Sequence, residues 1–278
     1  MDKYSRTILI AVVFSLLVSL WHPASAQSQA PEARKFDEFG DLQLSDIAAR
    51  LDNFAIELRQ NPQSRGFLIV YRSRRDLPGL SSRLVNWMKG YLMHYRGISE
   101  ETIVAVDGGV AGAVAQELWV VPPGAAPKPR ADAYATQIED TDSVRKFDEG
   151  LYPTRNDFEL YLWDASVSLD AFAEALRKEP EAFGYLIAYA GYRIEERVDV
   201  DEKGRKKTRR RVLLDPPGTA AEELKRTKEV LDRYLRPELR IKLVNGGYRT
   251  IRSVEYWIVP RGGHAPIPTP NAFPKRRR

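Results

Sequence analysis

The sequence lacks cysteine altogether and contains only three histidines, His22, His94 and His264. Without cysteine the chain forms neither disulfides nor thiolate metal sites, so its folded part must be held together by apolar cores. The histidines are too few and too far apart in sequence to indicate a zinc or copper site. We therefore predict no metal site and no cofactor.

Long apolar runs are also scarce. The main one covers residues 8–20 and follows two basic residues, Lys3 and Arg6. It is shorter than the roughly 20 residues of a membrane-spanning helix, and small residues follow it at Ala24 and Ala26. A basic start, an apolar run and small residues in this order are typical of a secretory signal peptide.

This leader predicts export. We expect residues 1–26 to be a signal peptide that is cleaved after Ala26, which leaves a mature protein beginning at Gln27. No later stretch is long and apolar enough to predict an integral membrane span. The expected location is therefore the periplasm or the extracellular space.

Positive charge is in only slight excess, because the formal net charge is +5 over 278 residues. Such a mild excess indicates an interaction with an anionic partner only where the basic residues cluster.

The most informative feature present is an internal repeat. The sequence Lys-Phe-Asp-Glu occurs twice, and longer segments recur in the same order with only length changes between them. The matching pairs are 35–38 with 146–149, 51–59 with 169–177, 107–109 with 245–247, and 117–122 with 255–260. Ordered matches of this kind indicate a duplicated unit.

Each copy predicts the same order of elements. An amphipathic helix begins near Ser45 or Ser168 and is followed by a short buried strand. A second helix comes next, with a capping box predicted at Thr219 and Glu222 in the second copy. Two strands close the unit, and the first of them is expected to end at a glycine pair in a turn with positive backbone dihedrals. An additional first strand is expected near residues 35–36 and 157–162.

The predicted fold class is therefore mixed α/β, an α+β sandwich of two tandem β-α-β-α-β-β units with the helices on one face of a mixed sheet. Proline-rich and basic segments flank the units and are expected to be linkers or disordered. The predicted parts are a signal peptide at 1–26, a first unit at 33–122, a linker at 123–145, a second unit at 146–262 with an insertion at 191–217, and a disordered basic tail at 263–278.

The repeated unit, with its strand-helix-strand-Gly-Gly pattern and a Tyr-Leu pair near the end of the second helix, resembles the OmpA-like domain family. The resemblance implies a non-catalytic domain that binds peptidoglycan. It implies further that an Asp after the second strand and an Arg on the following helix hold the diaminopimelate of the stem peptide, whose ammonium and carboxylate suit such a pair. Arg83 and Arg226 are candidates for the arginine, and Asp76 is the candidate acid of the first copy. The alternative for both arginines is a solvated helix flank.

Two enzyme functions are alternatives to this binding function. Glu117 and Glu255 recur at equivalent positions, and paired carboxylates are the machinery of glycoside hydrolysis. Their place at the start of a strand is also typical of an outward polar face. A Ser-His-acid triad would depend on His94, which has no counterpart in the second copy.

The insertion in the second copy is the most unusual segment. Alternating residues and a Glu-Lys-Gly turn predict a long hairpin with one acidic and one basic arm. Cross-strand charge pairing on a solvated ribbon is one interpretation, and contact with an anionic partner is the other. The basic candidates for such a contact are Arg205, Lys206, Lys207, Arg209, Arg210 and Arg211, together with Lys275 to Arg278 of the tail. Nucleic acid is a less favoured partner, because no aromatic residue interleaves the basic run.

Taken together, the sequence predicts an exported, non-catalytic binding or scaffolding protein of the cell envelope. Its expected partner is peptidoglycan or another anionic envelope polymer. The alternatives are a polysaccharide-directed hydrolase that uses Glu117 and Glu255, and a binder of anionic polymers that uses the basic hairpin.

Overall fold

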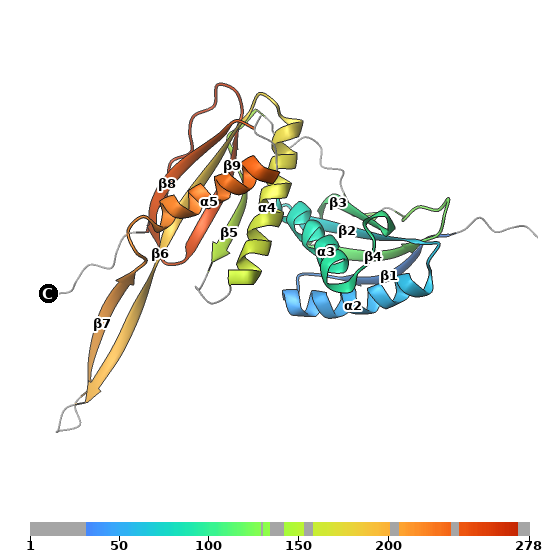
Figure 1. Ribbon diagram of the computed structural model, residues 1–278, viewed down its shortest axis with the longest axis horizontal. Helices are drawn as coiled ribbons and strands as arrows, with labels where there is room; N and C mark the ends of the chain where they lie inside the picture. The colour runs from blue at the N-terminus through green and yellow to red at the C-terminus, as the bar shows by residue number, and fades with distance from the viewer. Residues whose placement is uncertain are drawn as a thin grey trace, which may run out of the picture.

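A computed structural model describes residues 32–128, 130–133, 142–152, 158–200, 206–234 and 239–271 (Figure 1). The predicted signal peptide, the hairpin tip with Arg205, and Lys275 to Arg278 lie outside these ranges.

The first unit has the predicted order of elements. Its parts are β1 (Arg34–Phe39), α2 (Leu44–Gln60), β2 (Arg65–Ser73), α3 (Leu80–Arg96), a short 3-10 helix (Glu100–Thr102), β3 (Ile103–Ala111) and β4 (Ala115–Val121). The strands form a mixed sheet in the order β1-β4-β2-β3, in which only β2 and β3 run parallel. The parallel pair is possible because α3 provides the crossover between β2 and β3.

The second unit repeats this sheet. Its parts are β5 (Arg145–Tyr152), α4 (Phe158–Lys178), β6 (Phe183–Val200), β7 (Lys206–Leu214), α5 (Thr219–Tyr234), β8 (Ile241–Arg249) and β9 (Arg252–Val259). Strands β5, β9, β6 and β8 pair as β1, β4, β2 and β3 do, and β6 extends outward to pair with the inserted β7. The predicted α+β class and the duplication are therefore present in the structure.

Both helices of each unit pack on one face of its sheet, as the sequence predicted (Figure 1). Phe54 on α2 and Phe172 on α4 are fully buried at equivalent places in the two cores. Three-and-four spacing of apolar residues produces this burial, because it gives each helix one continuous apolar stripe. Val167 of α4 belongs to the core of the first unit, so the two units share apolar contacts through α3 and α4.

Several local predictions were wrong. Ser45 caps no helix: α2 begins at Leu44 after Gln43, which makes no side-chain cap. Residues 158–162 belong to α4 and not to a strand, so Ser168 lies inside that helix. The strand that precedes α4 is β5. At the start of α5, the hydroxyl of Thr219 donates to the carbonyl of Pro216, and Glu222 pairs with Arg226, so no capping box forms.

The glycine pairs lie within strands, whereas a turn was predicted. Strands β3 and β8 continue through Gly108–Gly109 and Gly246–Gly247, where the register with the neighbouring strand shifts. The second glycine of each pair has a positive φ, of 79° and 88°, as expected. At the first glycine, a Cβ atom would lie 2.5 Å from the ring of Tyr71 or 2.3 Å from that of Tyr189. The pair is thus a bulge that admits a tyrosine ring.

Among the described helices, none combines the length and the apolar character needed to cross a membrane.

Candidate functional site

The helix-free face of each sheet carries a cluster of four charged residues. The first cluster is Lys35, Glu38, Glu117 and Arg130, and the second cluster is Lys146, Glu149, Glu255 and Arg249. Lys35 Nζ lies 2.7 Å from Glu117 Oε1 and 2.6 Å from Glu38 Oε2. Lys146 Nζ lies 2.9 Å from Glu255 Oε1 and 2.6 Å from Glu149 Oε2. The repeated Lys-Phe-Asp-Glu motif therefore supplies a lysine and a glutamate to each cluster.

A tryptophan hydrogen-bonds to one glutamate of each cluster, and the arginine of the cluster contacts both glutamates. The indole nitrogens of Trp119 and Trp257 donate to Glu117 and Glu255 at 2.9 and 3.0 Å. These tryptophans occupy equivalent registers, opposite Lys35 and Lys146 on the neighbouring strand. Arg130 contacts both glutamates of the first cluster. Arg249 donates to both glutamates of the second cluster at 2.9 Å.

These contacts control the ionisation of the clusters. Burial acts to lower the pKa of Lys35, but hydrogen bonds to Glu117 and Glu38 outweigh it and raise that pKa. Burial acts to raise the pKa of Glu255, but hydrogen bonds from Lys146, Trp257 and Arg249 outweigh it and lower that pKa. Lys35 and Glu255 are therefore held in their charged forms.

The same geometry removes the support for a hydrolase. Glu117 and Glu255 are 0% and 3% exposed, and each accepts hydrogen bonds from a lysine and a tryptophan of its own unit. A glycoside hydrolase needs two carboxyl groups that face a substrate groove, one of which holds a proton. These two buried glutamates instead pair with partly exposed cations in separate sheets.

Proline-rich segments cover both clusters. The first strap comprises residues 122–128 and 130–133, and the second strap comprises residues 260–271. Each begins with a turn in which a glycine has a positive φ, of 83° at Gly124 and 84° at Gly262. The straps follow equivalent strands and return over the helix-free face of the sheet.

A tyrosine hydroxyl anchors each strap. The hydroxyl of Tyr189 accepts a hydrogen bond from the backbone of Thr269 at 3.0 Å and donates to Glu255 at 3.2 Å. The hydroxyl of Tyr71 likewise contacts the backbone of Arg130. The prediction of a disordered tail from residue 263 is therefore wrong for 263–271, and Pro266 in this segment is buried. The sequence indicates that residues 260–271 correspond to the first strap, because Gly124 and Gly262 are equivalent positions of the repeat.

Arg83 lies at the joint between the two units. Its Nε donates to Asp148 Oδ2 at 2.9 Å, and Ser168 donates to the same oxygen at 3.2 Å. Asp148 on β5 is only 1% exposed, and this burial raises the pKa of its carboxyl group despite the nearby guanidinium. The backbone nitrogen of Gly79, just before α3, also donates to the carbonyl of Phe147 at 2.8 Å. Arg83 is thus a joint residue and does not line an open cleft with Asp76.

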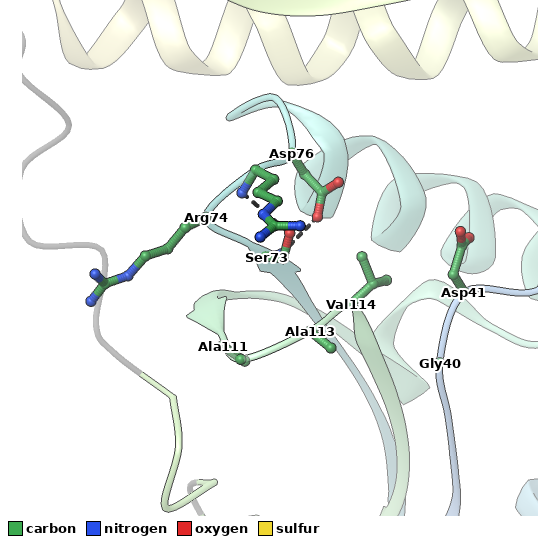
Figure 2. A pocket seen from close by; sticks show the side chains of 10 residues that line it. Gly40, Asp41, Ser73, Arg74, Asp76, Ala111, Ala113 and Val114 are labelled. Atoms are coloured by element: carbon green, nitrogen blue, oxygen red, sulfur yellow. Dashed lines mark hydrogen bonds between the residues drawn. The ribbon is translucent and has the colours of Figure 1, made fainter.

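Asp76 lines a shallow, open hollow of about 830 Å³ at one end of the first sheet (Figure 2). Its carboxylate accepts a hydrogen bond from the backbone of Ser73 at 2.8 Å, which closes the turn after β2. Figure 2 shows Arg74 extending away from Asp76. The other lining residues are Gly40, Asp41, Ser73, Arg75, Ala111, Gly112, Ala113 and Val114.

Arg226 lies on the exposed flank of α5. Its side chain is 54% exposed, and its guanidinium pairs with Glu222 one turn earlier at 2.6 Å. The solvated-flank interpretation therefore applies to Arg226. The structure does not bring the carboxylate and guanidinium implied by the OmpA-like resemblance together in either unit.

The inserted hairpin projects away from the second unit (Figure 1). Beyond Gly191, β6 pairs only with β7, and Tyr192–Val200 runs opposite Lys206–Leu214. We call these two segments the ribbon. Arg209 Nε lies 2.9 Å from Asp199, and Arg210 Nε lies 2.6 Å from Glu196, so cross-strand charge pairing is present. Both arginine side chains nevertheless remain exposed, by 71% and 72%.

The remaining basic candidates of the hairpin are partly described. Arg211 is exposed and faces Glu195 in the register, and Lys206 is exposed opposite Val200. The backbone of Lys207 is described but its side chain is not, and Arg205 falls in the undescribed tip. Within the described ranges, no group of three or more His, Asp or Glu side chains is arranged to hold a metal ion.

Comparison with known proteins gave no match to a family model, to a curated protein or to a solved structure.

Proposed function

We propose that this protein is an exported, non-catalytic component of the cell envelope. Its two OmpA-like units form a scaffold, and the ribbon binds an anionic envelope polymer. The leader at residues 1–26 supports export, and a mature protein that begins at Gln27 in intact-mass measurements would agree with it.

One observation carries the binding proposal. The buried carboxylates of the clusters and of the joint have cationic partners that are at most 34% exposed. Arg209 and Arg210 of the ribbon are also paired, but they are 71% and 72% exposed. An exposed ion pair in water is weak, so an anionic surface competes for these guanidinium groups at little cost. Residues 193–211 hold nine basic and five acidic side chains, which is a local net charge of +4 in a chain of +5. The excess positive charge is therefore concentrated on this projection.

The scaffold role rests on the joint between the units. A buried carboxylate, a backbone hydrogen bond and shared apolar contacts connect α3 of the first unit with β5 and α4 of the second. Such contacts oppose free rotation of the two units relative to each other.

Binding should be measured by co-sedimentation with purified peptidoglycan sacculi and by titration with dextran sulfate, a soluble polyanion. The test variant replaces Arg209, Arg210 and Arg211 by glutamine. Each basic residue near an anionic surface contributes about 1 kcal/mol, and partial pairing reduces this, so the affinity should fall at least about tenfold. It should also weaken steeply between low and physiological salt.

A matched control removes the same charge elsewhere. Lys178, Lys225 and Lys228 are exposed helix residues in i,i+4 pairs, and replacing all three by glutamine leaves the ribbon intact. We expect this variant to bind like the wild type. An equal loss of affinity in both variants would mean that only the net charge of the protein matters. If the wild type bound neither sacculi nor dextran sulfate at low salt, the proposal would be refuted.

A further inference from the structure

The ribbon has two chemically different faces. In its antiparallel register, directly opposed residues share a face, and consecutive residues alternate between faces. Ile194 opposes Val212, Glu196 opposes Arg210, and Val198 opposes Thr208 on one face. On the other face, Glu195 opposes Arg211, Arg197 opposes Arg209, and Asp199 opposes Lys207. We call the face that carries Ile194, Val198 and Val212 the apolar face.

The apolar face is exposed to solvent. Its four large apolar side chains, Ile194, Val198, Val212 and Leu214, are 45%, 53%, 36% and 50% exposed. They account for four of the nine exposed large apolar residues in the described part of the chain, and they lie on one two-stranded projection. A sheet face with this pattern normally packs against a second layer, and a two-stranded hairpin without one is only marginally stable. The pattern therefore indicates a surface that is covered by a partner.

Two kinds of partner are disfavoured by charge. Stacking the apolar faces of two copies would bring together two ribbons that each carry a net charge of +4. Adding a peptide strand to the outer edge of β7 would require pairing with a strand whose sequence is Lys-Lys-Thr-Arg-Arg-Arg, and such charged edges oppose strand addition. An anionic surface with an apolar layer beneath it avoids both problems, because it attracts the positive charge and needs no strand pairing.

We propose that the apolar face of the ribbon docks on the surface of an anionic lipid bilayer. The four apolar side chains enter the interfacial layer, and Lys206 and Arg210, whose register positions lie on the same face, contact lipid phosphates. This inference rests on the affinity for anions that the proposed function gives the ribbon, and it extends that affinity from a polymer to a lipid surface. The ribbon lies in the interface without spanning the bilayer, because the outer edges of both strands carry peptide groups that hydrocarbon cannot hydrogen-bond.

The absence of cysteine makes a direct test possible, since one engineered thiol is labelled uniquely. Val198→Cys places an environment-sensitive fluorophore on the apolar face, and Arg197→Cys places it on the opposite face one residue away. On vesicles that contain phosphatidylglycerol, the label at position 198 should shift to the blue and gain intensity, whereas the label at 197 should stay water-like. Water-like emission from both positions on vesicles that bind the protein would overturn the proposal.

An affinity measurement separates lipid docking from simple charge attraction. The variant carrying Ile194→Thr, Val198→Thr and Val212→Thr keeps β-branched side chains and all charges of the ribbon. Its affinity for phosphatidylglycerol vesicles should fall roughly tenfold or more, because polar groups replace the apolar contacts. Its affinity for dextran sulfate should be unchanged, because the variant keeps every basic residue of the ribbon.

Each other outcome has a distinct meaning. Undiminished vesicle binding by the threonine variant, or binding of the wild type to dextran sulfate but not to the vesicles, overturns the lipid proposal and leaves the proposed function intact. Equal binding to neutral phosphatidylcholine vesicles also overturns it, since charge would then play no part. Binding to neither the vesicles nor dextran sulfate refutes the proposed function, and the lipid proposal with it.

Discussion

Arg83 of the first unit donates a hydrogen bond to Asp148 of the second, with 2.9 Å between Nε and Oδ2. Asp37 is the counterpart of Asp148 in the repeat, and it pairs at 2.6 Å with Arg50 on the helix of its own unit. The residue equivalent to Arg50 is Ser168, which is neutral. An arginine from the neighbouring unit thus replaces a contact that the first unit makes internally.

Removing this arginine should destabilise the protein. Arg83→Gln leaves the buried Asp148 without its cationic partner and should lower the free energy of unfolding by about 2–3 kcal/mol. The matched control is Arg226→Gln, which removes an exposed i,i+4 pair and should cost less than about 0.5 kcal/mol. Urea unfolding of both variants measures the difference. Similar values for the two would mean that the joint between the units contributes nothing to stability.

The buried carboxyl group of Asp148 should give stability a specific pH dependence. Burial raises the pKa of Asp148 above its ordinary value of 3.8, so the native protein retains this proton to a higher pH than the unfolded chain does. The contribution of Asp148 to stability is therefore present at low pH and is lost as the pH rises above 3.8. Asp148→Asn cannot lose a proton and should remove this part of the decline.

The measurement for Asp148 is urea unfolding at a series of pH values from 4 to 7, compared between the wild type and Asp148→Asn. The difference in unfolding free energy should change in favour of the asparagine variant as the pH rises. A constant difference over this range would contradict the raised pKa.

The hydroxyl of Tyr189 should hold the second strap. Tyr189→Phe keeps the ring but removes both the acceptor for Thr269 and one donor to Glu255, at a cost of about 1–2 kcal/mol. Amide hydrogen exchange should accelerate in residues 263–271 more than in β6, because the strap loses a direct anchor. Tyr95→Phe is the control, since Tyr95 lies on α3 of the other unit and is 61% exposed. Unchanged exchange in the strap would show that this hydroxyl does not hold it.

The tryptophans of the two clusters should differ in their contributions. Trp119 is only 5% exposed, so Trp119→Ala should cost roughly 3–5 kcal/mol. Trp119→Phe keeps an aromatic ring in the core but removes the donor to Glu117 and part of the ring volume, and should cost less than the alanine change. Trp257 is partly exposed, and its alanine variant should be less damaging than that of Trp119. Thermal or urea unfolding tests this order, and a cost below about 1 kcal/mol for Trp119→Ala would place its ring outside the core.

The sequence alone determined the duplication, the order of the elements and the fold class. These are local properties: three-and-four spacing around Phe54 and Phe172 produces helices, and short apolar runs such as residues 67–71 produce buried strands. The hairpin of the second unit was also predictable, because its alternation and its turn residues are contiguous in the chain.

Only the tertiary structure decided which partner each charged residue has. Arg83 and Asp148 are 65 positions apart, and nothing in the sequence near either one indicates that the two units meet there. Glu117 was predicted to lie on an outward polar face, but it is buried under the first strap. The composition of the strap had indicated only a linker. Local patterns record which residues can form a helix or a strand. The partner of a buried charge depends on how separate surfaces pack, and that packing is a property of the whole fold.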